Sequence, residues 1–249
     1  MDENKQAEQE EIRRFGKYRI AEHYLVMVTF AILAATGLAQ KFHEFELSHW
    51  IVMSLGGIDV ARLIHRYTGL TFALLTLQHI AVASTGMLYR RWPASIVINA
   101  NDFTDAIDNI KYYFGVTNRP ALCDRYDYKQ KFEYWGVVIG GVLMIFTGVI
   151  LWFPTLVARY LPGELIPAAK AAHTNEALLA FLVIIIWHIY NSIFSPEVFP
   201  LDTSIFTGGI SRKRMVHEHP VELARMEGKS LEEIIAGHHG DEYEAAEDS

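Results

Sequence analysis

The sequence predicts an all-α integral membrane protein, folded as a bundle of four membrane-spanning helices. Hydrophobic residues make up 51% of the 249-residue chain, which is ordinary for a globular domain. They are, however, gathered in four long runs that carry almost no charge. A helix needs about 20 residues to cross about 30 Å of hydrocarbon, and each run is close to that length.

The predicted spans are, in chain order, residues 20–39, 64–88, 133–153 and 173–194. The alternative is a soluble bundle of four buried helices, in which each helix carries a charged, solvated stripe at every third or fourth position. The stretches 137–153 and 177–187 have no such stripe. Membrane insertion, with lipid around the spans, is therefore favoured.

The distribution of Lys and Arg predicts the orientation of the spans. Residues 1–19 contain five of them and residues 89–131 contain seven, whereas the loops 40–63 and 154–172 contain two each. Basic residues concentrate on the cytoplasmic side of a membrane protein. We therefore expect both termini and the 89–131 linker to be cytoplasmic.

Three segments outside the spans are predicted to form short helices, and one is predicted to be disordered. An interfacial helix is expected within residues 45–60, and a charged helix within residues 218–236. A third helix is expected over residues 101–114, where Asn101 and Asp102 are candidate capping residues. The end of the chain, residues 237–249, is polar and acidic enough to be disordered.

The charge of the chain is unevenly distributed. The formal net charge is −7, but residues 215–249 hold ten acidic and two basic residues, so the rest of the chain sums to about +1. A protein without a basic face is not expected to bind nucleic acid. We divide the chain into a cytoplasmic N-terminal segment, a four-span domain and an acidic cytoplasmic tail, which are residues 1–19, 20–214 and 215–249.

Cys123 is the single cysteine of the sequence. One thiol cannot form an internal disulfide, a four-cysteine zinc site or an iron–sulfur cluster. The sequence also lacks a Cys-x-x-Cys-His motif, so a haem would not be attached covalently.

Five of the eleven histidines lie in or at the ends of the predicted spans: His23, His65, His79, His173 and His188. A polar ring at membrane depth is costly without a partner, so each is a candidate functional residue. His65 and His79 are 14 residues apart in the sequence, which places them within about 40° of one helix face and about 21 Å apart along its axis. His173 and His188 are 15 residues apart, which gives about 60° and about 22 Å.

Both of these spans run in the same direction, so His65 and His173 fall at one membrane depth and His79 and His188 at another. His23, near the start of the first span, also falls at the second, inner depth. Facing neutral imidazoles on different helices can hold a haem iron from both sides. The spacing predicts two b haems, one between His65 and His173 and one held by His188 with either His23 or His79. A membrane histidine can instead form a hydrogen bond between helices.

Thr-Gly pairs recur at residues 36–37, 68–69, 85–86 and 147–148. Small residues let membrane helices pack closely, and they can also give clearance for a flat ligand. The pairs do not belong to a recognisable sequence repeat.

Several short motifs occur in a fixed order along residues 13–214. They are Arg19-Ile-Ala-Glu-His23-Tyr, Leu63-Ile-His65-Arg-Tyr-Thr-Gly69, Gln130-Lys131-Phe-Glu-Tyr-Trp135, Thr147-Gly-Val-Ile-Leu-Trp-Phe-Pro154, His173, and Trp187-His188-Ile-Tyr190. In this order they resemble the cytochrome b (gamma) subunits of membrane-bound, quinone-linked formate dehydrogenases. That family lies within a wider group that serves other respiratory dehydrogenases and hydrogenases.

The resemblance implies an outer haem iron bound by His65 and His173 and an inner haem iron bound by His23 and His188. The family pattern has no histidine at the position of His79. This residue is therefore an alternative inner ligand, a residue of a quinone pocket or a proton carrier.

The resemblance also implies a menaquinone or ubiquinone pocket near the inner haem, formed partly by an Asn-x-Gly-Gln stretch before the third span. The equivalent stretch here is Asp127-Tyr-Lys129-Gln130, which keeps Gln130 but replaces the family's Asn and Gly. Asp127 can relay protons to a quinone or be an exposed loop charge. Arg66, beside His65, can pair with a haem propionate or anchor its span at the interface, and the same holds for Arg19.

The function implied is that of an electron-transfer subunit in a prokaryotic cytoplasmic membrane. Electrons would come from the iron–sulfur and catalytic subunits of a respiratory oxidoreductase and pass through two haems to quinone near the cytoplasmic side. One alternative is the reverse direction, in which quinol oxidation feeds a reductase or hydrogenase. A haem-free proton or ion transporter is the other. The dehydrogenase chemistry would belong to other chains.

Overall fold

The computed structural model describes residues 11–195 and 198–236, and the chain divides into two compact units. The bundle unit consists of Ala21–Trp92 and Trp135–Asp202. The terminal unit consists, among the described residues, of residues 11–20, Pro93–Tyr134 and residues 203–236.

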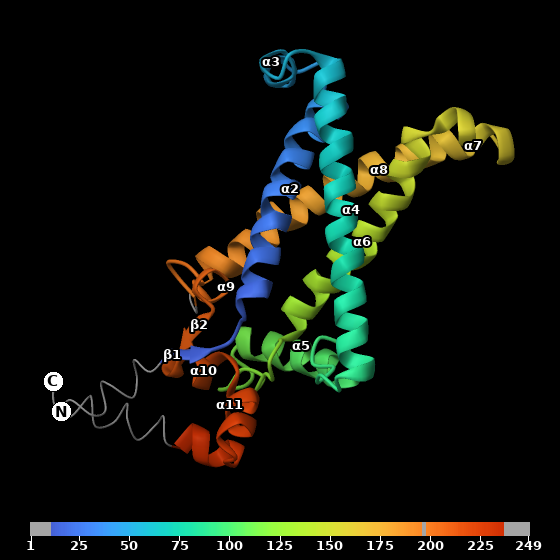
Figure 1. Cartoon of the computed structure of the whole chain (residues 1–249). Helices are drawn as coiled ribbons and strands as arrows, with labels where there is room; N and C mark the ends of the chain where they lie inside the picture. The colour runs from blue at the N-terminus through green and yellow to red at the C-terminus, as the bar shows by residue number, and fades with distance from the viewer. Residues whose placement is uncertain (1–10, 196–197, 237–249) are drawn as a thin grey trace. The chain divides into compact units, whose positions relative to one another are not determined.

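Four helices in the described ranges are long and apolar enough to cross a membrane (Figure 1). They are α2 (Lys17–Lys41), α4 (Ile58–Tyr89), α6 (Tyr128–Trp152) and α8 with its continuation (Leu165–Phe194). All four predicted spans are present, and each helix begins earlier than predicted, by three to eight residues. In α4 the added first turns contain the ion pair Asp59–Arg62, which a helix accommodates outside the apolar layer.

The four spans leave most of their apolar side chains on the surface. At most 17% of the most apolar stretch of each span is buried within the chain. Leu74 and Ile139, for example, are both more than half exposed. Apolar surface of this extent is unfavourable in water and is what a lipid-facing helix needs.

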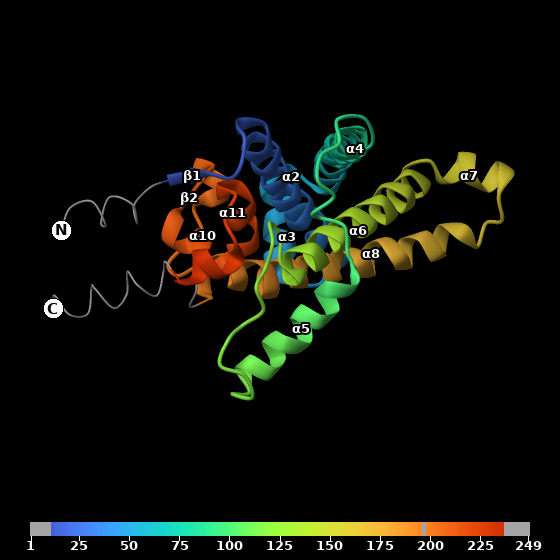
Figure 2. The ribbon, with the colours of Figure 1, turned by 90° about the horizontal axis from the view of Figure 1, so that it is seen from below.

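One short helix lies between the first and second spans, and another lies between the third and fourth. The helix α3 (Glu46–Ser54) follows α2, which confirms the helix predicted within residues 45–60. The helix α7 (Pro154–Tyr160) connects α6 to α8 (Figure 2). Pro154 stands at the first helical position of α7, where its missing N–H is not needed.

The fourth span changes from an α-helix to a π-helix along its length. The regular part, α8 (Leu165–Leu182), continues into η1 (Val183–His188) and η2 (Tyr190–Phe194). The N–H of Ile189 donates to the carbonyl of Ile184, five residues back. π-helical turns are rare and often lie at functional sites. His188 ends η1, so its direction differs from that given by a regular helix.

The terminal unit has a small core formed by segments from both ends of the described chain. The strand β1 (Glu11–Arg13) pairs antiparallel with β2 (Gly209–Ser211), and Ile12 lies opposite Ile210. The helices α9 (Ser204–Thr207), α10 (Arg212–Glu218) and α11 (Pro220–Glu227) surround this pair (Figures 1 and 2). Its buried cluster comprises Ile210, Met215, Val216, Leu223, Ala224 and Ile234.

The helix predicted within residues 218–236 is present as α11, and much of the segment named as the acidic tail also packs into this small core. Residues 231–236 are also helical, and Ile234 joins the buried cluster. The apolar side chains of this segment are few, but they lie on faces that meet Ile12 and Ile210. The disorder expected for residues 237–249 falls outside the described residues.

The linker helix α5 (Ala100–Tyr113) begins at a different cap from the predicted one. Asn99 is the N-cap residue, and its side chain accepts a hydrogen bond from the N–H of Asn101 at 2.8 Å. Asp102 accepts from the N–H of Asn99 at 2.7 Å, which completes a capping box. Asn101 and Asp102 thus belong to the first turn rather than to the cap.

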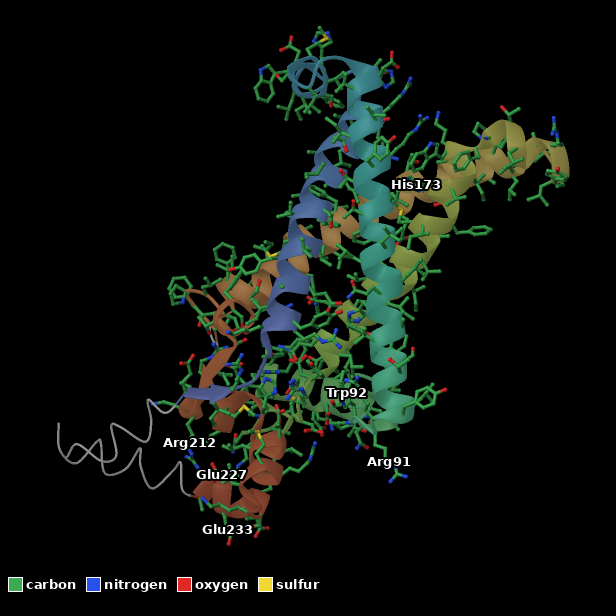
Figure 3. The ribbon with its side chains drawn as sticks, viewed as in Figure 1. Arg91, Trp92, His173, Arg212, Glu227 and Glu233 are labelled. Atoms are coloured by element: carbon green, nitrogen blue, oxygen red, sulfur yellow. The ribbon has the colours of Figure 1, made fainter. Side chains whose placement is uncertain are left out.

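The ion pair between Arg212 and Glu227 allows a test of pH dependence in the terminal unit (Figure 3). Partial burial raises the pKa of Glu227, but hydrogen bonds from Lys229 and Arg212 outweigh it, so the pKa lies below the ordinary value of 4.5. A lowered folded-state pKa stabilises the fold above the unfolded pKa, and this contribution is lost as the pH falls through the folded pKa.

We expect Glu227→Gln to lower the unfolding free energy of the terminal unit by up to about 1 kcal/mol near neutral pH. The difference from the natural protein should shrink as the pH falls below about 4.5. Hydrogen exchange of the α10 and α11 amides at several pH values measures it. A difference that stays constant over this range would show that the ion pair does not cause it.

Candidate functional site

The structure brings the rings of His65 and His173 close together inside the bundle unit, in an edge-to-face arrangement. His65 lies on α4. His173 lies on α8 (Figure 3). Their ring centroids are 6.3 Å apart, and the ring planes are inclined at 74°. The two residues come from separate spans, as the depth comparison in the sequence predicts.

A second pair of rings is formed by His23 and His188. His23 lies on α2 and His188 ends η1. Their centroids are 6.4 Å apart, with an interplanar angle of 42°. Both ring pairs therefore have nearly the same separation, although the fourth span is paired with α4 in one and with α2 in the other.

This separation fits two imidazoles that share one metal ion. An imidazole nitrogen lies about 2 Å from a metal ion that it coordinates, so two nitrogens on opposite sides of the ion are about 4 Å apart. Each ring centre lies ~1 Å further from the ion than its nitrogen, so the two ring centres are about 6 Å apart. Direct packing of the rings, without an ion, would not require the same separation in pairs that join the fourth span to two different helices.

Each pair fits an ion that brings further ligands of its own. Among residues 11–195 and 198–236, no group of three or more His, Cys, Asp or Glu side chains could hold a bare metal ion. Two imidazoles leave most coordination positions of a transition metal open. A porphyrin fills four of them in the plane between two axial ligands, so the donor set suits a haem iron.

Glycine residues lie directly beside the His65–His173 pair. A Cβ atom on Gly37 would lie 3.1 Å from Cε1 of His65, and one on Gly148 would lie 3.4 Å from Cε1 of His173. Larger residues at these positions would displace the imidazoles. The Thr-Gly pairs at 36–37 and 147–148 were expected to leave room for a flat ligand. The glycines of these two pairs instead leave room for the histidine rings.

The threonines of these two pairs contact the same histidines. The distance from Thr36 Oγ1 to His65 Nδ1 is 2.9 Å, and that from Thr147 Oγ1 to His173 Nδ1 is also 2.9 Å. The sequence analysis did not single out either threonine as a hydrogen-bond partner. The recurrence of Thr-Gly pairs in the sequence could have indicated these contacts, because the threonine and the glycine of each pair contact the same histidine ring.

His79 is paired with an acidic side chain that the sequence reasoning also missed. Its Nδ1 lies 3.0 Å from Oε1 of Glu22 on α2. Glu22 is buried, with 9% of its surface exposed. A buried carboxylate within a span is costly unless it is paired, and His79 supplies that partner. Glu22 was recognisable in the sequence as an acidic residue next to His23.

Asp127 and Gln130 form a reciprocal cap at the start of α6, in the terminal unit. The N–H of Gln130 donates to Oδ1 of Asp127 at 2.7 Å, and the N–H of Asp127 donates to Oε1 of Gln130 at 3.2 Å. Lys129 Nζ lies 3.9 Å from Oδ2 of Asp127. Asp127 and Gln130 therefore have a structural task, and neither is a fully exposed loop residue.

The two arginines considered as propionate partners differ in their surroundings. Arg66 is exposed on α4, next to His65 in sequence. The guanidinium of Arg19 lies 5.7 Å from the ring centroid of Tyr18. At this distance the guanidinium and the ring are within range of a cation–π contact.

Comparison with known proteins agrees with this geometry. Residues 14–208 match the family model described as prokaryotic cytochrome b561. The cytochrome b556(fdo) subunit of formate dehydrogenase from Escherichia coli K12 is 28% identical over 175 residues, which cover 69% of this chain and 74% of that protein. The cytochrome b556 subunit of formate dehydrogenase from Haemophilus influenzae is 27% identical over 168 residues, 68% of this chain and 65% of that protein.

A third relative is the nitrate-inducible cytochrome b556(Fdn) subunit of formate dehydrogenase from Escherichia coli K12. It is 20% identical over 198 residues, which cover 80% of this chain and 83% of that protein. The family match contains all four spans completely and all five histidines of the spans. The predicted fold, a membrane bundle of helices that binds haem b, is confirmed, and the chain belongs to the prokaryotic cytochrome b561 family.

Proposed function

We propose that this chain is the membrane electron-transfer subunit of a respiratory formate dehydrogenase. The observation that carries the proposal is the pair of histidine couples, both about 6.3 Å across, in a chain of the cytochrome b561 family. The similar relatives are named as cytochrome b556 subunits of formate dehydrogenases, which supports that partner. Its iron–sulfur and catalytic subunits would carry the dehydrogenase chemistry.

In this proposal His65 and His173 hold one b haem, and His23 and His188 hold the other. A bound haem supplies one-electron chemistry, because its iron is stable in both the ferric and the ferrous state. The histidines bind as neutral imidazoles, so no ligand charge has to be placed in the hydrocarbon layer. Gly37 and Gly148 keep the space that the rings of the first couple need.

The proposed orientation follows from the distribution of basic residues. Both termini and the 89–131 linker are cytoplasmic, so the His65–His173 couple is the outer one and the His23–His188 couple the inner one. Residues 20–214 form the electron-transfer domain, with residues 1–19 and 215–249 on its cytoplasmic side. Electrons from the outer partner then reach quinone near the cytoplasmic surface.

The proposed quinone contacts include Gln130 and Asp127. The family pattern before the third span supports them, and Gln130 is the residue that this sequence shares with it. Each uses one side-chain oxygen for the helix cap, and the Gln130 amide N–H₂ has further donors for a quinone oxygen.

Quinol oxidation by the purified chain tests this function. The full chain is reconstituted in lipid nanodiscs with its haem, and a menaquinol or ubiquinol analogue is added without the other subunits. We expect the quinol to reduce part of the haem that dithionite reduces. If dithionite reduced the haem but quinol never did, the proposed quinone site would be contradicted. If the chain contained no haem, the whole proposal would be contradicted.

The substitution His79→Leu tests which histidine completes the inner couple. We expect the variant to keep its full haem content, because the ring opposite His188 is that of His23. The control is His23→Leu, which should lose one haem. Haem per chain is measured as the pyridine haemochromogen. Loss of one haem in His79→Leu together with full retention in His23→Leu would reverse the assignment.

A further inference from the structure

We propose that Thr36 and Thr147 are positioning residues that fix the proton on Nδ1 of His65 and His173 and so lower the midpoint potential of the haem between them. The inference rests on the proposed function, since it assumes that these two histidines are haem ligands. It concerns how their neighbours prepare them for that role.

The first step is the direction of the threonine protons. A hydroxyl has a single proton to donate. Thr36 Oγ1 lies 2.7 Å from the carbonyl oxygen of Ile32, and Thr147 Oγ1 lies 2.7 Å from that of Leu143. A carbonyl can only accept, so each threonine donates its proton to its own helix.

The second step concerns the histidines. Because its proton is already used, each threonine oxygen accepts a hydrogen bond from the ring nitrogen 2.9 Å away. Nδ1 of both histidines therefore carries the proton, and Nε2 carries the lone pair. Nε2 is then the nitrogen that can bind iron, as a second-shell bond to the other nitrogen generally dictates.

The same device occurs twice, on two different pairs of helices. Thr36 on α2 serves His65 on α4, and Thr147 on α6 serves His173 on α8. In both cases the following residue is a glycine that lies against Cε1 of the same ring. Two independent helix pairs thus place a threonine oxygen at the same distance from Nδ1, and a glycine beside the ring, on the two sides of one site.

The consequence is electronic as well as geometric. An acceptor on Nδ1–H makes the imidazole a more basic ligand, and a more basic ligand favours the ferric state. Removing the acceptor should therefore raise the midpoint potential of this haem. Second-shell hydrogen bonds are one of the levers by which a protein sets a haem potential.

The test uses Thr36→Val and Thr147→Val, which keep the shape of the side chain but remove its oxygen. In a redox titration of the full chain in nanodiscs, each variant should favour the ferrous state of one haem about threefold to tenfold, or about 30–59 mV for one electron. The other haem should not shift. The double variant should shift the same haem further.

Matched controls separate this role from packing. Thr29 lies on the same face of α2 two turns earlier, is buried, and donates to the Leu25 carbonyl at 2.8 Å, so Thr29→Val should leave both potentials unchanged. Thr36→Ser keeps the hydroxyl and should restore the natural potential. Equal shifts in Thr29→Val and Thr36→Val, or no shift in either site variant, would overturn the proposal.

Failure of the function is distinguishable from failure of this inference. If His65 and His173 are not haem ligands, replacing either by leucine leaves the haem content unchanged. If they are ligands but the threonines are not positioning residues, leucine removes a haem while the valine variants titrate like the natural protein.

A different observation concerns α5, and from it we infer that one face of this helix binds lipid at the membrane surface. Phe103, Ile107, Ile110 and Phe114 repeat at helical spacing, so they line one face. All four side chains are more than half exposed. Apolar residues that include aromatic rings, opposite a polar face, are typical of helices that lie in the membrane interface.

The polar side of α5 ties the helix to the start of a span. Lys131 Nζ lies 2.6 Å from Oδ1 of Asp102, and both side chains are buried. Lys131 stands in the first turn of α6, and its neighbour Phe132 is 66% exposed. Asn109 accepts from the N–H of Ala121 at 2.7 Å. These bonds fix the polar side of α5 within the terminal unit, at the first turn of α6, and leave the apolar face exposed.

Nitroxide labels at adjacent positions test the lipid contact. In a Cys123→Ser background, Ile107→Cys carries the label on the apolar face, and Asp108→Cys carries it on the exposed polar face. In nanodiscs the label at 107 should relax more with oxygen, and that at 108 more with a water-soluble nickel chelate. Equal access of the chelate to both, or exclusion of both reagents from 107 by a covering protein, would overturn the inference.

Discussion

Replacing His173 with leucine is expected to remove one haem from each chain and to leave the other in place. Leucine fills a similar volume but has no nitrogen to coordinate iron, and a single axial imidazole from His65 would remain. The His23–His188 couple uses other side chains and should keep its haem. The haem content, measured as the pyridine haemochromogen, should fall by half.

The control for this experiment is His49→Leu in α3, a histidine outside the four spans. It should leave the haem content unchanged. If His173→Leu retained all of its haem, or if both variants lost equal amounts, the His65–His173 couple would not be a specific haem site.

Replacing Lys131 with methionine is expected to destabilise the terminal unit by about 3–5 kcal/mol, because it leaves the Asp102 carboxylate buried without its charged partner. Lys131 is 5% exposed and Asp102 7% exposed, and their atoms are 2.6 Å apart. Asp102 also caps the start of α5. Its own substitution would therefore combine two effects, which makes Lys131 the better choice.

Lys111→Met in α5, the helix that also carries Asp102, is the matched control. Lys111 pairs with Asp108 at 2.8 Å, but both side chains are more than 40% exposed. Its loss should cost about 0.5 kcal/mol or less. Amide hydrogen exchange of α5 in the full chain gives both values. Equal destabilisation by the two substitutions would show that burial does not decide the strength of the Lys131 pair.

The spans were predictable because their signal is local. A charge-free run such as residues 137–153 is sufficient to indicate a helix in lipid, whatever its neighbours are. The ends of the helices were less predictable. The helix α4 begins at Ile58, well before its apolar run, because a helix continues into water when charged residues such as Asp59 and Arg62 pair along it.

The histidine couples were predictable only in part. Helical rise gives the depth of each ring, so the level of His65 and His173 follows from the sequence. It does not say which helices are neighbours, and His23 and His79 therefore remained equal candidates at the inner level. The ring pair His23–His188 and the hydrogen bond between His79 and Glu22 depend on which helices pack side by side. Helical periodicity does not give this information.

The hydrogen bonds of Thr36 and Thr147 and the fold of the terminal unit depend on tertiary structure in the same way. Each threonine meets a histidine 29 or 26 residues away in the sequence. Likewise, Ile12 and Ile210 meet through a short strand pair between distant segments. The sequence of residues 215–236 indicated a charged helix but not a buried core, because its few apolar side chains become buried only against those partners.

The most direct test of the central claim is electron paramagnetic resonance of the purified, oxidised chain, combined with its iron and haem content. Two histidine couples that each hold a b haem predict two low-spin ferric signals of bis-imidazole type and two haems per chain. A sample without haem, or one whose haem is high-spin with a single imidazole, would contradict the claim.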